Sequence, residues 1–198
     1  MTTVVLLRHA ATPYNAQGRL QGSLDVALDH AGQAQAEAVA SAVVARHGVP
    51  DVVLTSPLAR ASQTADAVAR LADVEAMPDA RLTQRSYGEW EGLTWDEVRA
   101  RWPEEYERRM AGLDPRIAGW DGSVAVGARV AACLQEAAEG HELIVAVSHG
   151  SAIMLGTLAL LGLDSYSRVL GQLSHGRWNV LRQRGAGEWT LERYAIGG

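Results

Sequence analysis

The chain has 198 residues and a formal net charge of −5, and arginine supplies all 18 of its basic side chains because the sequence contains no lysine. The missing lysine amine excludes Schiff-base enzymes, pyridoxal-phosphate enzymes and Walker-type nucleotide binders. The acidic balance with dispersed arginines argues against a nucleic-acid partner, which would need a clustered basic face.

The length predicts one domain, residues 1–198. The single cysteine, Cys133, cannot form an internal disulfide, so we expect a reducing compartment, the cytoplasm. It also lacks the arginine six positions on that a cysteine phosphatase loop requires, because Glu139 stands there. The apolar run at the N-terminus is too short for a signal peptide or a membrane span. Because there is only one cysteine, the sequence has no cysteine pair of the kind that binds zinc.

Strand and helix patterns alternate from the N-terminus. Segment 3–7 is apolar on both faces, as expected of a central strand in a parallel sheet. Asp29 precedes an alanine-rich segment, 31–46, that it would cap as a helix. A second strand at 51–55 and a helix at 58–71 follow. This alternation predicts an α/β fold with a mostly parallel sheet.

Residues 81–122 differ in character, because two short helical patterns here are broken by prolines. We interpret this stretch as a cap-like insertion that covers one end of the sheet rather than as a separate domain. For three of its tryptophans, packing is favoured over substrate contact. These are Trp90, Trp95 and Trp102.

The C-terminal part continues the alternation. Helices are predicted over 123–139 and 150–161, on either side of a buried strand at 143–147. The last two strands, 177–184 and 188–194, alternate in period two around the turn Gly185-Ala186-Gly187. This hairpin pattern predicts an antiparallel edge strand.

Arginines and histidines follow the ends of three predicted strands. Arg8 and His9 follow the first strand, Arg60 lies shortly after the second, and His149 follows the third. Ligands of open α/β sheets bind beyond the carboxyl ends of the strands. The sequence therefore predicts one pocket that contains two histidines and two arginines.

This set of residues suits phosphoryl transfer. A phosphate monoester needs fixed positive charge on its non-bridging oxygens, most of all in the loose transition state of transfer, and Arg8 and Arg60 supply it. A neutral imidazole can attack phosphorus through one nitrogen when a carbonyl holds the other as N–H. Flanking arginines favour that neutral form by charge repulsion.

Short motifs around these residues occur in a distinctive order. In chain order they are LLRHA at 6–10, Asn15, RLQG at 19–22, SPLARA at 56–61, YGEWEG at 87–92 and SHG at 148–150. Together they resemble the histidine phosphatase superfamily, in its phosphoglycerate mutase-like branch. The resemblance covers most of the chain.

The resemblance implies that His9 is the phosphorylated nucleophile and that Arg8, Arg60 and His149 form the phosphate pocket. It implies a three-layer α/β/α sandwich, mostly parallel with one antiparallel strand, that needs no metal and no nucleotide cofactor. Secondary contacts to the substrate would come from Asn15, Gln21, Gly22 and the backbone of Gly150.

Two positions depart from the family pattern. Ala10 replaces the usual glycine after the arginine-histidine pair, which is tolerated unless its backbone needs a positive φ. Gln84 stands where the family usually has the glutamate that protonates the leaving oxygen, and glutamine has no proton to transfer. Three explanations stay open: a substitute carboxylate, a weak enzyme, or phosphate binding without turnover. The nearest substitutes by motif are Glu89, Glu91 and Asp25.

We therefore expect a metal-independent phosphomonoester hydrolase that forms a phosphohistidine and acts on a small phosphorylated metabolite. A phosphoglycerate mutase is the alternative within this class, although a mutase must shield its phosphoenzyme from water and region 92–123 is short for that. A binding protein of low or no activity is the alternative in another class. A homodimer through an edge strand or an exposed helix is compatible with the sequence.

Two further residues are candidates for the pocket, Arg85 and His175.

Overall fold

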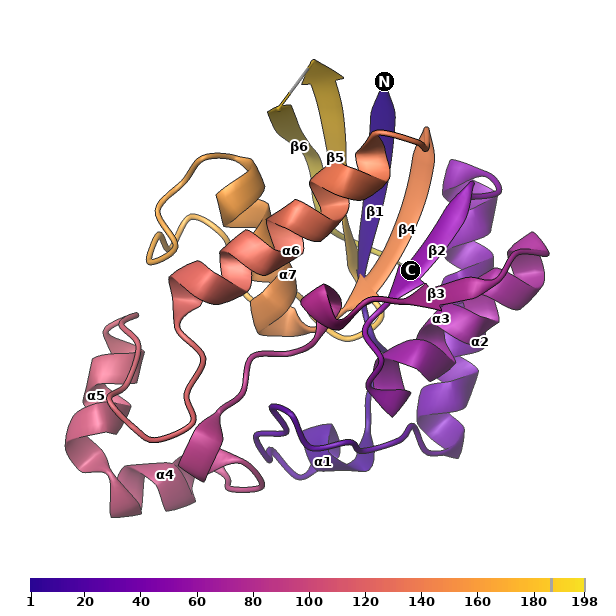
Figure 1. The fold of residues 1–198 in the computed structure, drawn as a ribbon. Helices are drawn as coiled ribbons and strands as arrows, with labels where there is room; N and C mark the ends of the chain where they lie inside the picture. The colour runs from indigo at the N-terminus through magenta and orange to yellow at the C-terminus, as the bar shows by residue number, and fades with distance from the viewer. Residues whose placement is uncertain (186, 198) are drawn as a thin grey trace.

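A six-stranded sheet crosses the centre of the computed structural model, which describes residues 1–185 and 187–197 (Figure 1). Its spatial order is β3-β2-β4-β1-β5-β6. The strands are β1 (Thr2–Arg8), β2 (Val52–Thr55), β3 (Ala76–Pro78), β4 (Leu143–Ser148), β5 (Trp178–Gly185) and β6 (Glu188–Ile196). Strands β1 to β4 pair in parallel, whereas β5 runs antiparallel to both of its neighbours.

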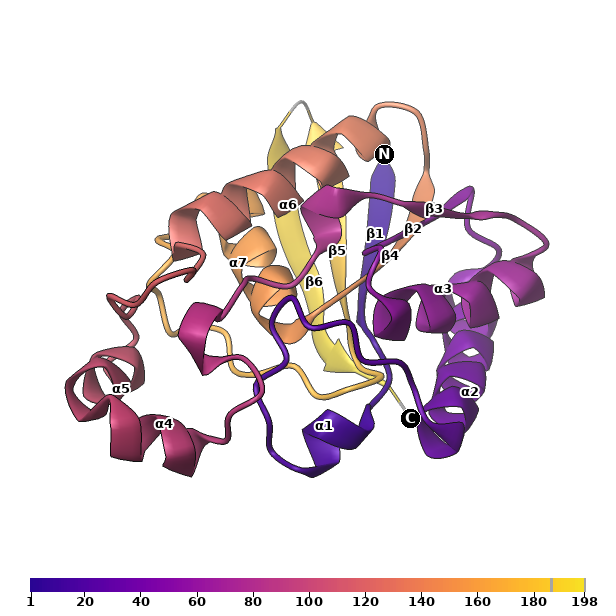
Figure 2. The same ribbon diagram turned by 60° about the horizontal axis from the view of Figure 1, so that its bottom comes forward.

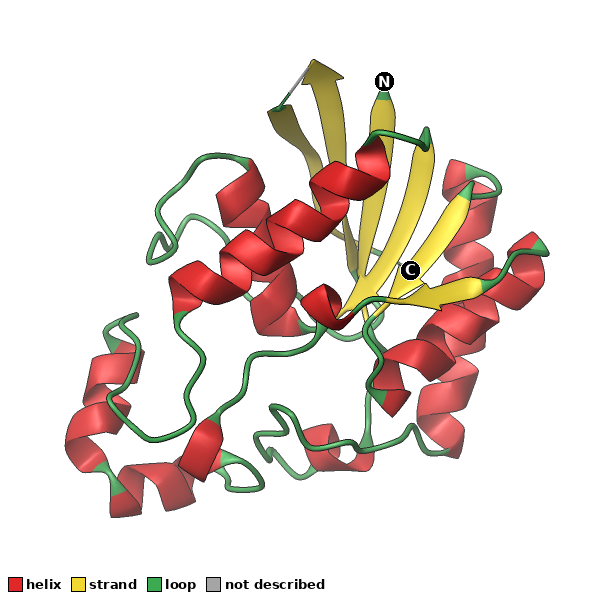
Figure 3. Cartoon of the chain, in the orientation of Figure 1, coloured by secondary structure: helices red, strands yellow, loops and turns green. Residues whose placement is uncertain are grey.

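Helices cover both faces of this sheet, so the chain forms three layers (Figure 3). One face is covered by α2 (His30–His47) and α3 (Ala59–Ala72), and the other by α6 (Ser123–Ala138) and α7 (Gly150–Leu160). The shorter helices are α1 (Pro13–Ala16), α4 (Trp95–Arg101), α5 (Pro103–Met110) and the 3₁₀ turns η1 (Ala80–Leu82) and η2 (Gly88–Trp90).

The alternation of side chains along β1 explains the two cores. Val4 and Leu6 are fully buried in the cluster beneath α6 and α7, and Val5 and Leu7 are fully buried in the cluster beneath α2 and α3. Because successive side chains of a strand point to opposite faces, a strand covered on both sides is apolar throughout. The predicted three-layer α/β/α sandwich is confirmed.

The structure differs from the expectation at both sheet edges. The edge strand β3 was not predicted, since three residues without an apolar alternation leave no pattern to detect. The antiparallel hairpin is present, but the strand that opposes the others is β5, one place in from the edge strand β6. Ala186 of the predicted turn lies outside the described residues.

The segment that contains α4 and α5 lies at the end of the sheet where β1 and β4 finish, next to α1 (Figure 2). Its own small core surrounds Trp90, which is fully buried together with Val98. The partly buried rings of Tyr87, Trp102 and Trp120 pack against that core. Within the described residues, no helix has the length and apolarity needed to cross a membrane.

Candidate active site

The sheet order brings the predicted residues to one place. Strand β4 lies between β1 and β2, and Arg8 at the end of β1 is in register with Ser148 at the end of β4. On the other side, the backbone N–H of Ser56 donates to the carbonyl of Val147. The three strand ends are therefore adjacent, and the side chains that follow them, Arg8, His9, Arg60 and His149, gather in one cluster that we call the phosphate pocket.

His9 lies at the base of this pocket and is 3% exposed. Its Nδ1 is 2.7 Å from the carbonyl oxygen of Ala10, so Nδ1 carries the proton and Nε2 is the unprotonated nitrogen. Burial, followed by the charges of Arg60 and Arg8, lowers the pKa of His9 well below 6.5. At neutral pH the ring is therefore a neutral imidazole with a nucleophilic Nε2.

Arg8 is held by the loop that precedes β5. One terminal nitrogen donates to the carbonyl of Leu173, and the other donates to Nε2 of His175 at 2.7 Å. Burial lowers the pKa of Arg8 to about 10, which leaves it protonated at neutral pH. Burial, with the charges of Arg8 and Arg60, lowers the pKa of His175 to about 3, so this ring accepts a hydrogen bond from Arg8 as a neutral group.

Arg60 lies in the first turn of α3 and is 1% exposed. Its terminal nitrogens donate to the carbonyls of Gly22 at 2.8 Å and Leu24 at 2.7 Å, and its Nε donates to Nδ1 of His149 at 3.3 Å. A guanidinium has five N–H donors, so two remain on the terminal nitrogens for an anion. Burial lowers the pKa of Arg60 to about 10, with partial compensation led by Asp25.

His149 is fully buried beside His9, with ring centroids 5.0 Å apart. Its Nδ1 accepts from Arg60, and its Nε2 is 2.8 Å from the hydroxyl of Ser56, so Nε2 carries the proton. Burial, His9 and Arg60 lower the pKa of His149 well below 6.5. Contact between His149 and a phosphate oxygen therefore requires its N–H to exchange Ser56 for the ligand.

Gly150 is the first residue of α7, whose N-terminus has no side-chain cap. A Cβ atom at this position would lie 3.2 Å from Cζ of Arg8, so the glycine lets the guanidinium pass close to the backbone. Unpaired N–H groups and the macrodipole make a helix N-terminus suitable for an anion. This N-terminus and both arginines thus favour a phosphate at the same place.

The other predicted contacts divide into two groups. Oδ1 of Asn15 accepts from the backbone N–H of Thr12 at 3.0 Å, in a capping box that begins α1. Gln21 is buried with its Oε1 3.1 Å from the Thr12 hydroxyl. Only Gly22 contacts the pocket's cations directly, through the carbonyl that accepts from Arg60. Asn15 and Gln21 therefore shape the loop after β1 through their hydrogen bonds to Thr12, and neither forms a hydrogen bond with the four central side chains.

The two departures from the family pattern have different consequences. Ala10 is fully buried without a positive φ, and its N–H donates to the Thr64 hydroxyl at 3.1 Å, so alanine fits. Gln84 lies on the segment between η1 and η2, where its Oε1 accepts from the N–H of Arg85 and its Nε2 is 3.4 Å from the hydroxyl of Tyr87.

The three candidate substitutes for the acid are hydrogen-bonded elsewhere or exposed. Glu89 is exposed. Glu91 accepts hydrogen bonds from Ser23 and from the segment 86–87. Asp25 accepts from the N–H of Ala59 at 2.7 Å, at the start of α3.

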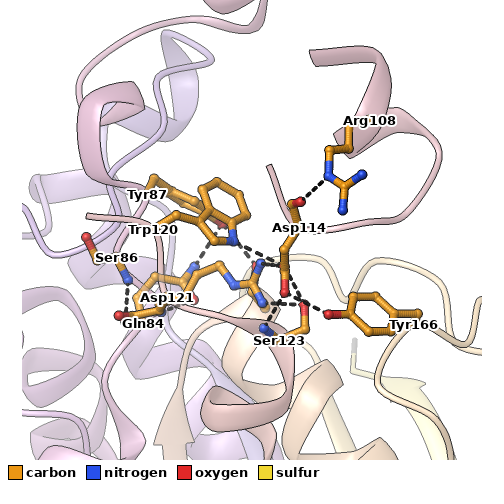
Figure 4. Close-up of polar contacts among 11 residues, drawn as sticks. Gln84, Ser86, Tyr87, Arg108, Asp114, Trp120, Asp121, Ser123 and Tyr166 are labelled. Carbon is orange, nitrogen blue, oxygen red and sulfur yellow. Dashed lines mark hydrogen bonds and ion pairs between the residues drawn. The ribbon is translucent and has the colours of Figure 1, made fainter. Parts of the chain in front are cut away.

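A cavity of about 450 Å³ adjoins the phosphate pocket through Tyr87, Gly150 and Ser151. Three arginines line it, Arg85, Arg109 and Arg168. None of the described lining residues is a carboxylate. Arg85 is fixed by Asp114 at 3.1 Å and by Ser123 at 2.7 Å. Asp114 also accepts from the side chains of Trp120 and Tyr166, which ties the segment after α5 to the loop after α7 (Figure 4).

His175 and Ser56 are the two pocket residues without a predicted role. The sequence indicates only that His175 lies in a loop able to face the pocket. The structure places its ring centroid 5.3 Å from that of His9. Ser56 gave no signal apart from its place in a motif. Of the described side chains, no three histidines, cysteines or carboxylates gather in a way that could hold a metal ion.

Comparisons with known proteins identify the family of this chain. The family model of the histidine phosphatase superfamily, branch 1, matches residues 4–197. Phosphoserine phosphatase 1 of Hydrogenobacter thermophilus is 31% identical over 83% of this chain and 78% of its own length. Glucosyl-3-phosphoglycerate phosphatase of Mycolicibacterium vanbaalenii is 33% identical over 88% of this chain and 81% of its own.

Solved structures give the same result at the level of the fold. A mycobacterial glucosyl-3-phosphoglycerate phosphatase in complex with VO3 superposes with a TM-score of 0.90 at 28% identity, over 100% of both chains. A phosphoserine phosphatase from Entamoeba histolytica, in complex with 3-phosphoglyceric acid, gives a TM-score of 0.83 at 29% identity over 98% of this chain and 96% of that one. The chain therefore belongs to the histidine phosphatase superfamily, branch 1.

Proposed function

We propose that the chain hydrolyses phosphate monoesters through a phosphohistidine formed at Nε2 of His9. One observation carries this proposal: a buried neutral imidazole with its Nδ1 proton held by a carbonyl lies beside two guanidinium groups. The imidazole supplies the nucleophile, and Arg8 and Arg60 supply charge where the transferred phosphoryl group is most negative. The relatives named as phosphatases support the same reaction.

The reaction has two steps. Nε2 of His9 attacks phosphorus while the bond from phosphorus to the leaving oxygen breaks, and the phosphorylated ring keeps its Nδ1 proton on the carbonyl of Ala10. Water then attacks the phosphohistidine, and the electron pair of the N–P bond returns to His9. The N-terminus of α7 and the two arginines stay in place through both steps, so little reorganisation is needed.

The substrate we infer is a small phosphorylated metabolite with a second acidic group. Arg85 in the wall of the adjoining cavity is paired with Asp114, so the positive charge of the described wall comes from Arg109 and Arg168, and it favours an anionic leaving group. The names of two relatives, phosphoserine phosphatase and glucosyl-3-phosphoglycerate phosphatase, refer to phosphate esters that carry a carboxylate.

Residues 81–122 act in this proposal as a cap on the cavity, because Arg85, Tyr87 and Arg109 line it from that segment. A mutase has to hold its phosphoenzyme away from water, and a cap of two short helices favours hydrolysis instead. Phosphoglycerate interconversion well above hydrolysis would support the mutase alternative.

The decisive experiment compares the parent with His9→Ala on p-nitrophenyl phosphate in the presence of EDTA. We expect turnover by the parent, none by His9→Ala, and an acid-labile phosphoenzyme in the parent only. His30→Ala is the matched control, since His30 is exposed at the start of α2. Binding of inorganic phosphate without any turnover would instead support the non-catalytic alternative.

A further inference from the structure

The missing carboxylate at Gln84 leaves the leaving oxygen without an evident proton donor. The resemblance places the leaving oxygen next to the side chain of residue 84, so a substitute donor has to lie close to Gln84. The hydroxyl of Tyr87 satisfies this condition, because it is 3.4 Å from Nε2 of Gln84. Glu89 is exposed, and Asp25 is bonded to the start of α3.

The surroundings of Tyr87 fix its hydroxyl beside the N-terminus of α7. The oxygen is 3.0 Å from the hydroxyl of Ser151, directly after the anion-binding residue Gly150 of α7. Its ring packs against the indole of Trp120 with centroids 5.3 Å apart (Figure 4). Its backbone N–H donates to Glu91 at 3.0 Å. The side chain is therefore anchored at both ends.

Proton donors are otherwise scarce in this part of the site. Among the described residues, the wall of the 450 Å³ cavity contains no carboxylic acid and no histidine, and its two phenols are Tyr87 and Tyr166. The Tyr166 hydroxyl already donates to Asp114 at 3.2 Å. The Tyr87 hydroxyl instead lies beside the N-terminus of α7, 3.0 Å from the hydroxyl of Ser151.

We propose that the hydroxyl of Tyr87 is the general acid of this chain, protonating the leaving oxygen in place of a carboxylate at position 84. The inference rests on the proposed phosphomonoesterase function. A phenol is a stronger acid than an alcohol, so transfer of its proton to an alkoxide is downhill. Arg8 and Arg60 then stabilise the phenolate by their charge.

The proton balance closes over the two steps. As Nε2 of His9 bonds to phosphorus, the P–O bond breaks, its electron pair goes to the leaving oxygen, and the Tyr87 proton follows. When water later attacks the phosphohistidine, its oxygen bonds to phosphorus, the N–P pair returns to His9, and a water proton restores the Tyr87 hydroxyl. Gln84 and Ser151 hold the hydroxyl without losing or gaining a proton.

The test measures how Tyr87→Phe depends on the leaving group. General acid catalysis contributes roughly 10²- to 10⁴-fold in rate when the leaving oxygen is a poorly stabilised alkoxide. We expect kcat/KM to fall about 10²-fold or more for β-glycerophosphate and less than about threefold for p-nitrophenyl phosphate, whose phenolate leaves without a proton. The ratio kcat/KM isolates the phosphorylation step, in which the leaving group departs.

Two further variants keep the result unambiguous. Tyr106→Phe removes a phenolic hydroxyl from α5, at a residue that packs against Trp95 but is not itself part of the cavity wall. It should leave kcat/KM unchanged for both substrates. Gln84→Ala removes one of the two contacts that hold the Tyr87 hydroxyl, so kcat/KM for β-glycerophosphate should fall less than in Tyr87→Phe. Equal losses for both substrates in Tyr87→Phe, or a leaving-group-dependent loss in Gln84→Ala alone, would overturn the assignment of Tyr87. A parent without His9-dependent turnover would overturn the proposed function, and this inference with it.

Discussion

Replacing Arg60 by lysine tests whether the pocket needs a guanidinium or only a positive charge. The side chain is 1% exposed and donates to the carbonyls of Gly22 and Leu24 and to Nδ1 of His149. A lysine ammonium is a single nitrogen, so it cannot reach all three acceptors across the width of a guanidinium. Three guanidinium nitrogens serve the three acceptors and the ammonium replaces only one of them, so two acceptors lose their donor; the bond to Leu24 is the partly buried one.

The cost follows from these contacts. A buried acceptor left without a partner costs roughly 1–3 kcal/mol, so two of them lower the free energy of unfolding by about 2–6 kcal/mol. For a domain of this length each kcal/mol lowers Tm by about 2–4 °C. We therefore expect Arg60→Lys to lower Tm by at least about 4 °C.

Charge is lost as well as geometry. Burial lowers the pKa of Arg60 from 12.5 to about 10. The same burial would also lower the pKa of a lysine at this position, and a lysine starts from a lower reference value of about 10.4. The variant then loses its cation at alkaline pH, where the parent keeps it. Removing one such stabilising donor typically lowers kcat by about 10²–10³.

The assay combines thermal unfolding with kcat on p-nitrophenyl phosphate from pH 6 to pH 9. Arg70→Lys is the matched control, because Arg70 lies on the same helix, is exposed and pairs with Glu37. It should change Tm by no more than about 1–2 °C. A folded Arg60→Lys protein with kcat within threefold of the parent at every pH would refute the argument from guanidinium geometry.

Two further predictions concern stability. His9, His149 and His175 have pKa values below the unfolded value of about 6.5, so the unfolded chain binds more protons below that pH, and stability falls as pH drops through it. Below pH 6.5, each of these histidines should lower the free energy of unfolding by about 1.4 kcal/mol per pH unit. Urea midpoints that stay constant from pH 7 to pH 5 would contradict this. At Gly156, a Cβ would lie 2.3 Å from Cγ1 of Val130. Gly156→Ala should therefore destabilise the chain by about 1–2 kcal/mol in chemical denaturation, and a Val130→Ala background should remove that loss.

The strength of the local pattern decided which elements could be predicted. The strand ending at Arg8 and the strand ending at Ser148 are apolar on both faces, so burial between two helix layers could be read from the residues alone. Strand β3 has no such pattern, because its pairing with β2 is made by backbone groups of any three residues in register. Whether a side chain fits at Gly150, and whether alanine fits at position 10, could be decided only from the backbone geometry.

The sequence by itself determined the chemistry available to this protein. It contains no lysine, two of its arginines and two of its histidines follow strand ends, and glutamine stands at the usual position of the acid. The tertiary structure alone decided which groups meet. His175 reaches Arg8 across 167 residues of sequence, and the Tyr87 hydroxyl reaches Ser151 across 64. No local pattern encodes such contacts, because they arise from the order in which the strands pair and from the loops that this order brings together.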